Sequence, residues 1–352
     1  KLESNGNGGN AGAIMLTTQP NGSFRLNNST INAAGGAPGS TGTHGSGASI
    51  RFANGATSFT GSAVMTTGTT GGDIEFQNEV TGGQDLRLTA TNITLRDVTA
   101  SGIQSYTATG VISANGTYTS DGQAITFSGA TRLDSAVTID TTNDGNAGTV
   151  GHVMFASTVQ SKATQFNDLT VKAGAGDITF SNTVGHELGS DKRLGDVQIS
   201  SARHVTVADT KLLHSNSLTQ LNGSGTTTFG GVVNVFGAVS LNGGGFWFKD
   251  AVSTTSGAHI TITNAGALTI AAGKSVNSGG KFEQLGSLAA STVSLGSNVT
   301  AGGLIKFAGD VTLTDSVTLD SSSANGNITF DGELNATTAR AQDLTVSSGT
   351  GD

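Results

Sequence analysis

Along most of the chain, apolar residues alternate with polar ones over short runs, and clusters of Gly, Asn, Asp or Ser interrupt the alternation. Residues two apart share one face of a β-strand, and the small polar residues between the runs favour turns. We therefore expect many short strands joined by tight bends. One pattern, an aliphatic residue (Phe in the copy at 246), any residue and then Phe, recurs with copies that begin at residues 74, 153, 178, 246, 305 and 328.

The spacing of these copies predicts a repeating unit. Most gaps between their Phe residues are near 25 or near 50, and a second alternating run follows many copies, as in 85–88, 168–171 and 343–346. Two or three short strands that close after about 25 residues describe one rung of a β-solenoid, whose units stack only on their neighbours. We predict an all-β chain of about 14 such rungs, with Ile, Val, Leu and Phe inside and Thr, Ser, Lys and Arg outside.

A longer period lies above the short one. Residues 125–141 match residues 305–321 at seven of 17 positions, and residues 155–177 resemble residues 330–352. The offset is 175 to 180 residues. We therefore expect one β-solenoid over 1–352 that contains about two copies of a larger module. Because the last residues stop within a motif, we expect this solenoid to be a fragment of a longer protein.

Composition narrows the class of protein. The 352 residues include 53 Gly, two Pro and no Cys. Collagen needs far more Pro in strict periodicity, and a disulfide-stapled domain needs Cys. The net charge of −8 argues against a nucleic-acid partner, which would require a basic face. The sequence contains no apolar run long enough to predict a membrane span. The absence of Cys fits an exported bacterial surface protein.

At the level of repeat style, the sequence resembles a known family. The segments 12–36 and 196–207 are similar to the filamentous-haemagglutinin type of repeat, and the likeness extends over nearly the whole chain. Such repeats belong to giant exported proteins of Gram-negative bacteria, including two-partner-secretion adhesins and autotransporter passengers. The resemblance implies a right-handed parallel β-helix that serves as an adhesive or matrix-forming rod at the cell surface. It transfers no catalytic residue to this chain.

Three functions remain open from the sequence. We favour a structural rod segment of a secreted, extracellular adhesin or matrix fibre, whose partners are neighbouring repeats or copies of itself. The alternative is a module that binds glycans or a receptor through protruding loops at 35–48 and 185–195. A carbohydrate-active enzyme is the least favoured, because two Tyr and one Trp offer few platforms for sugar rings.

Two features are candidates for contact with a partner. Phe246 and Phe248 occupy inward positions, so Trp247 must point outward, and we expect a loop of the chain itself to cover it. The 185–195 insertion is the densest charge cluster, and a solvated loop is its favoured interpretation. The residues of this loop that a partner would contact are His186, Glu187, Asp191, Lys192 and Arg193.

One segment resembles a metal site. Asp140 and Asp144 lie in an oxygen-rich stretch typical of calcium loops. The corresponding stretch, 320–327, lacks the second Asp, so a turn is the favoured interpretation. The six His residues show no spacing typical of zinc ligands. The sequence therefore predicts no cofactor, with calcium as the alternative.

Overall fold

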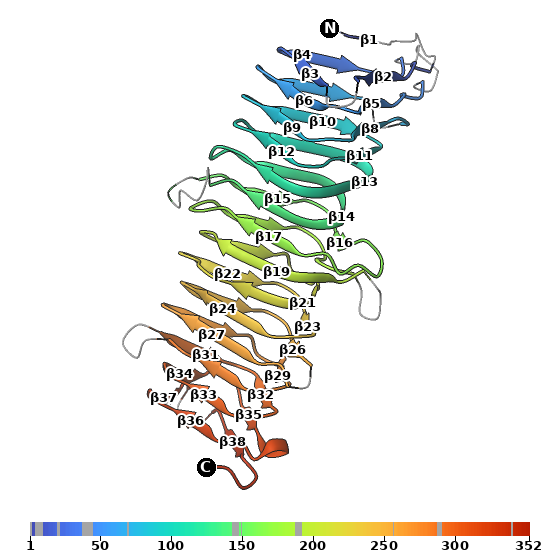
Figure 1. Cartoon of the computed structure of the whole chain (residues 1–352). Coiled ribbons are helices and arrows are strands. Elements are labelled where there is room, and N and C mark those ends of the chain that lie inside the picture. Colours follow the sequence, from blue (N-terminus) through green and yellow to red (C-terminus); the bar gives the residue numbers. More distant parts are fainter. Residues whose placement is uncertain are drawn as a thin grey trace, which may run out of the picture. The chain divides into compact units, whose positions relative to one another are not determined.

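The computed structural model describes residues 2–3, 10–19, 22–36, 45–68, 70–142, 148, 150–186, 192–255, 257–286, 291–338 and 341–352. It divides into two compact units, Lys1–Gly176 (unit 1) and Asp177–Asp352 (unit 2). Within each unit the chain winds through successive coils, and every coil places its strands beside those of the next (Figure 1). The predicted all-β, parallel β-helix fold is confirmed.

Unit 1 consists of three columns of parallel strands, named A, B and C here. The long strands β13 (Gln104–Thr119) and β14 (Ile125–Asp140) run through all three columns. Column A also contains β2 (Ile14–Thr17), β5 (Ile50–Ala53), β8 (Asp73–Phe76), β11 (Asn92–Thr94) and β16 (Val159–Ser161). Column B contains β3 (Ser23–Leu26), β6 (Ala56–Phe59), β9 (Val80–Gly82), β12 (Val98–Ala100) and β17 (Leu169–Lys172). Column C contains β1 (Leu2–Glu3), β4 (Ser29–Asn32), β7 (Ala63–Thr66), β10 (Leu86–Ala90) and β15 (Val153–Phe155).

Unit 2 repeats this plan in columns D, E and F, and a 3-10 turn, η1 (Ser322–Ala324), follows its strand β35. Column D contains β18 (Ile178–Phe180), β20 (Val205–Val207), β22 (Thr226–Phe229), β25 (Gly245–Phe248), β28 (Ala267–Ile270), β31 (Thr292–Leu295), β34 (Asp310–Leu313) and β37 (Leu334–Ala336). Column E contains the first half of β21 (Leu213–Gln220), β23 (Val233–Val235), β26 (Val252–Thr254), β29 (Ser275–Ser278), β32 (Asn298–Ala301), β35 (Val317–Asp320) and β38 (Leu344–Ser347). Column F contains β19 (Leu194–Ser201), the second half of β21, β24 (Val239–Gly243), β27 (Ile260–Asn264), β30 (Phe282–Gln284), β33 (Ile305–Phe307) and β36 (Ile328–Phe330).

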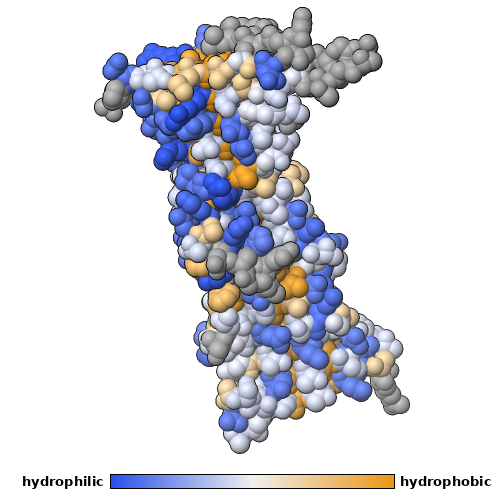
Figure 2. Space-filling view, turned by 90° about the vertical axis from the view of Figure 1, so that its right-hand side faces the viewer, coloured by the Kyte–Doolittle hydropathy of each residue, from blue (hydrophilic) through white to orange (hydrophobic). Residues whose placement is uncertain are grey.

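The inward rows of each column form the core. In β8, for example, Ile74 and Phe76 are buried, while Glu75 between them is partly exposed. The register of the strands stacks equivalent side chains of neighbouring coils on one another. The centroids of the Phe52 and Phe76 rings are 4.6 Å apart, and those of the Phe229 and Phe248 rings are 5.1 Å apart. Burying one such side chain contributes about 1.5–3 kcal/mol. Hydrophilic and neutral residues cover most of the face shown in Figure 2, and hydrophobic residues form only narrow patches.

The coils differ from the predicted repeat in two ways. Ile50 pairs with Ile74, 24 residues later, but the next coils of column A advance by only 19 residues, from Ile74 to Ile93 and on to Ile112. Moreover, the aliphatic-x-Phe pattern does not mark one place per coil. In unit 1 it occurs in columns A and C, and in unit 2 it occurs in columns D and F. The pattern occurs in more than one column because a strand of any column needs two apolar residues at its inward positions.

Polar side chains at the bends connect successive coils. The Asp85 carboxylate accepts a hydrogen bond from the Ile103 backbone N–H at 2.9 Å, and Asp97 accepts one from the Thr117 N–H at 2.8 Å. In unit 2, Asp310 accepts one from Glu333 in the same manner. Each bond satisfies a backbone donor where the strand pairing is interrupted. These three Asp residues at the bends therefore have a structural role.

The stacked Phe column gives a direct test of the core. Phe76→Ala removes a ring that is 1% exposed and leaves a cavity beneath Phe52. We expect it to lower the free energy of unfolding of unit 1 by about 3–5 kcal/mol. Val64→Ala, at an outward position that is 39% exposed, serves as the control and should change the free energy of unfolding by less than about 0.5 kcal/mol. Denaturant unfolding of both variants measures this, and equal effects would contradict the assigned faces.

Candidate functional site

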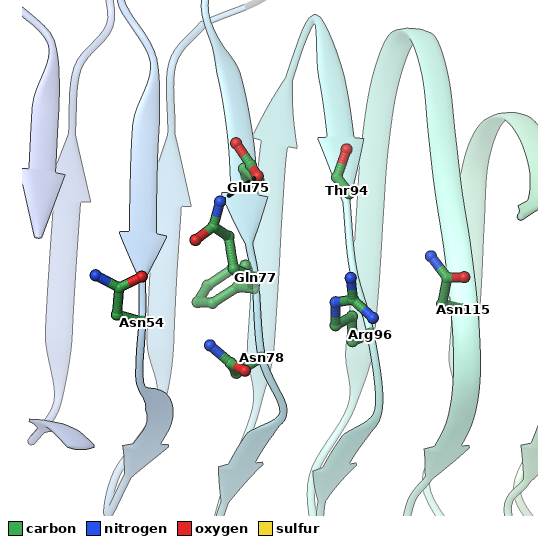
Figure 3. Close-up of a pocket in the computed structure, with 8 residues that line it drawn as sticks. Asn54, Glu75, Gln77, Asn78, Thr94, Arg96 and Asn115 are labelled. Atoms are coloured by element: carbon green, nitrogen blue, oxygen red, sulfur yellow. Dashed lines mark hydrogen bonds between the residues drawn. The ribbon is translucent and has the colours of Figure 1, made fainter. Parts of the chain in front are cut away.

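The bends between columns A and B of unit 1 border a groove of about 510 Å³. Its lining comes from four successive coils: Asn54 follows β5, Gln77 and Asn78 follow β8, Arg96 follows β11, and Asn115 lies within β13. Figure 3 shows these side chains on neighbouring strands, beside Glu75 and Thr94. The groove is thus a surface of carboxamide, hydroxyl and charged groups.

Register explains why these residues meet. Glu75 pairs with Thr94, and Thr94 pairs with Ser113, so the three form one outward row. Gln77, Arg96 and Asn115 each lie two positions beyond a member of that row and form a second row. Parallel neighbouring strands are about 4.8 Å apart. Hydrogen-bonding side chains therefore repeat at this interval along the groove.

The charges of the groove are unequally compensated. Arg51 Nε lies 3.0 Å from a carboxylate oxygen of Glu75, whose other oxygen accepts a 3.2 Å hydrogen bond from Gln77. Arg96 is exposed, and no carboxylate among the described residues lies within ion-pair distance of it. Likewise, the side chains of Asn78 and Asn115 make no hydrogen bond within the described part of the chain. The groove therefore offers a free cation and free amide groups to solvent.

Trp247 lies on the outer surface of unit 2, as its flanking Phe residues predicted. It is 42% exposed, whereas Phe246 and Phe248 are buried. Lys249 covers part of the ring: its Nζ lies 4.4 Å from the ring centroid and 2.8 Å from an Asp209 carboxylate oxygen. Trp247 borders a second groove, of about 500 Å³, lined mainly by Gly, Ala, Ser and Thr.

The described part of the 185–195 loop contacts β21 and Phe236, the residue that follows β23. Arg193 donates a 2.7 Å hydrogen bond to Asn216, and its guanidinium lies 4.1 Å from the centroid of the Phe236 ring. His214 Nδ1 donates to the carbonyl of His186 at 3.0 Å. His186 and Arg193 are thus brought to one cluster, with Lys192 beside Arg193 in sequence. Glu187 and Asp191 lie outside the described residues, as do 37–44 of the other predicted loop.

His214 is the buried titratable group of this cluster. Its side chain is 2% exposed, and its Nε2 atom has no hydrogen-bond partner among the described residues. Burial lowers the pKa of His214 below its usual value; the bond to His186 opposes this, and the positive charge of Arg193 adds to it. The folded chain therefore favours neutral His214. The sequence did not single out this residue, because whether a His is buried depends on the column in which its strand lies and on the side chains of the neighbouring coils.

Asp140, one residue of the candidate calcium stretch, is the last residue of β14. Asp140 Oδ1 accepts hydrogen bonds from the Thr142 N–H at 2.9 Å and the Thr142 hydroxyl at 2.6 Å, and Oδ2 lies 3.3 Å from Lys172 Nζ. Burial on its own would raise the pKa of Asp140, but the bonds from Thr142 and Lys172 lower it below its usual value. Asp144 lies outside the described residues. Within those residues, no group of three or more His, Asp or Glu side chains converges as a metal site.

Comparison with known proteins gives no relative for this chain: no family model, curated protein or solved structure is similar enough to be matched with it. Among the residues that the structure describes, none of the helical segments has the length and apolar character to cross a membrane. What the structure supports is a β-helix repeat protein with a polar groove in unit 1 and an exposed Trp in unit 2.

The exposure of Trp247 is testable because it is the single Trp of the chain. Acrylamide should quench its fluorescence less than that of free indole, since Lys249 covers part of the ring. Lys249→Ala should increase the Stern–Volmer constant by uncovering the ring. Lys274→Ala, whose Nζ lies near Asp250 and not near the indole, is the matched control. A constant typical of a fully buried Trp, unchanged in both variants, would contradict this surface arrangement.

The burial of His214 predicts that unit 2 becomes less stable as the pH falls. Because its pKa is lower in the folded chain than in the unfolded one, its contribution is fully present above about pH 6.5 and is lost as the pH falls through the unfolded value toward the folded one. Thermal unfolding of unit 2 should therefore shift to lower temperature between pH 7 and pH 5. His214→Gln should remove this portion of the shift, whereas His152→Gln, at an exposed position, should retain it. An unaltered pH profile in His214→Gln would refute the assignment.

Proposed function

We propose that the chain is a structural segment of a secreted bacterial adhesin or extracellular matrix fibre, similar to the filamentous-haemagglutinin type of repeat protein. In this proposal it acts as a stalk or a self-associating filament at the cell surface. The architecture of each unit supports a role as a scaffold. Nearly every described element is a strand that pairs with a strand of the coil before it and a strand of the coil after it. The absence of Cys is compatible with export.

The observation that carries the proposal is the in-register stacking of coils within each unit. The Phe52 and Phe76 rings stack in unit 1, and the Phe229 and Phe248 rings stack in unit 2. Because each coil pairs with the coils beside it and buries the same inward positions, such an array is a repetitive scaffold. We propose that this scaffold serves as a stalk or associates with copies of itself.

A second function has the support of a different observation. The groove between columns A and B presents amide, hydroxyl and guanidinium groups that are not used by the fold. This favours a binding role in addition to the scaffold, as in the glycan- or receptor-binding alternative. The proposal includes no catalytic activity, and turnover of any member of a polysaccharide panel would contradict it.

Self-association is tested on the chain itself. The proposal predicts concentration-dependent oligomers, which analytical ultracentrifugation and negative-stain electron microscopy would detect. A chain that is monomeric at all concentrations would contradict self-association.

A further inference from the structure

The groove between columns A and B of unit 1 combines a hollow with polar side chains that the fold does not use. By contrast, Arg132 pairs with Asp134 on its own strand and donates to the Ser113 hydroxyl of the neighbouring coil at 2.8 Å. In the groove, Arg96, Asn78 and Asn115 have no such partner within the described residues. Their donors and acceptors remain available to a ligand at no cost to the fold.

We propose that this groove binds a linear, carboxylate-bearing polysaccharide, a chain that contains uronic acid units, lying across the coils. The carboxamides of Asn54, Asn78 and Asn115 supply both donors and acceptors, and sugar hydroxyl groups need both. Arg96 supplies a cation that matches a carboxylate with paired N–H groups. The groove volume of about 510 Å³ is in the range of small-ligand sites.

The periodicity of the groove favours a polymer. Gln77, Arg96 and Asn115 lie on three successive coils, so polar side chains repeat about every 4.8 Å along the groove. That interval is comparable with the rise of one sugar unit along an extended polysaccharide. Successive units therefore meet hydrogen-bonding side chains of successive coils, and weak contacts add along the chain.

The chemistry of the lining argues against an apolar or peptide ligand. Phe76 contributes to the groove, but its ring is buried in the core. No exposed aromatic or aliphatic pocket therefore remains to hold a side chain of a peptide. Glu75 does not cancel the cation, because its carboxylate is already paired with Arg51 at 3.0 Å. Charge complementarity at the groove thus depends on Arg96.

The test uses the full chain and two matched ligands: a galacturonate hexamer, and the same hexamer with its carboxyl groups reduced to hydroxymethyl groups. Isothermal titration calorimetry at low salt should detect the uronate hexamer. The reduced hexamer should bind at least about tenfold more weakly, since a charged hydrogen bond is lost. Binding of the uronate hexamer should weaken as salt is raised, because exposed charges are screened.

Three variants locate the site. Arg96→Met should weaken binding of the uronate hexamer at least about tenfold and leave binding of the reduced hexamer unchanged. Asn78→Ala should weaken both hexamers. Arg87→Met removes the same charge at β10, where Arg87 pairs with Asp85 at 3.0 Å, and should leave both affinities unchanged. Circular dichroism and the thermal midpoint of each variant should equal those of the unaltered chain.

Several results would overturn this assignment. They are no binding of the uronate hexamer at millimolar concentration, equal binding of both hexamers, or equal loss in Arg96→Met and Arg87→Met. The last result would indicate general electrostatic attraction and no defined groove. Because none of these measurements depends on contacts between copies of the chain, the groove and the proposed self-association fail independently.

Discussion

Parallel pairing of each coil with the next, in register, is the interaction on which the rest of the structure depends. It satisfies the backbone groups of the strands and, by the same geometry, stacks every inward side chain on its equivalent one coil away. Phe52 on Phe76 and Phe229 on Phe248 are direct consequences. A unit built in this manner needs no bridges and few large side chains, which accounts for a chain without Cys and with few aromatic residues.

Register also organises the surface. Glu75 meets Arg51 because the two residues pair across neighbouring coils, and Arg96 lies beside Gln77 for the same reason. Residues that are remote in the sequence thus form rows that repeat along each unit. At the bends such rows satisfy backbone donors, as Asp85 and Asp97 do. In the groove of unit 1 such a row keeps the polar groups of Arg96 and Asn115 uncommitted, and this is where we propose that a repeating ligand binds.

The alternation of apolar and polar residues was sufficient to predict the all-β, parallel fold and the outward direction of Trp247. It was not sufficient to assign strands to columns, because the three columns impose the same inward requirement and differ only in their neighbours. Hence the pattern at Ile305 and the pattern at Phe246 were predicted to be equivalent, but they lie in columns F and D. The polar groove and buried His214 were missed for the same reason: both depend on which coil adjoins which.

The central claim, that coils of unequal length remain in register, is tested most directly by paired cysteines, since the chain has none of its own. Thr94 pairs with Ser113, 19 residues later, at a spacing of about 4.8 Å that suits a disulfide. Thr94→Cys/Ser113→Cys should therefore crosslink on oxidation of the folded chain. Thr94→Cys/Thr119→Cys, spaced by a uniform repeat of 25 residues, should not. Crosslinking of the second pair in place of the first would contradict the account.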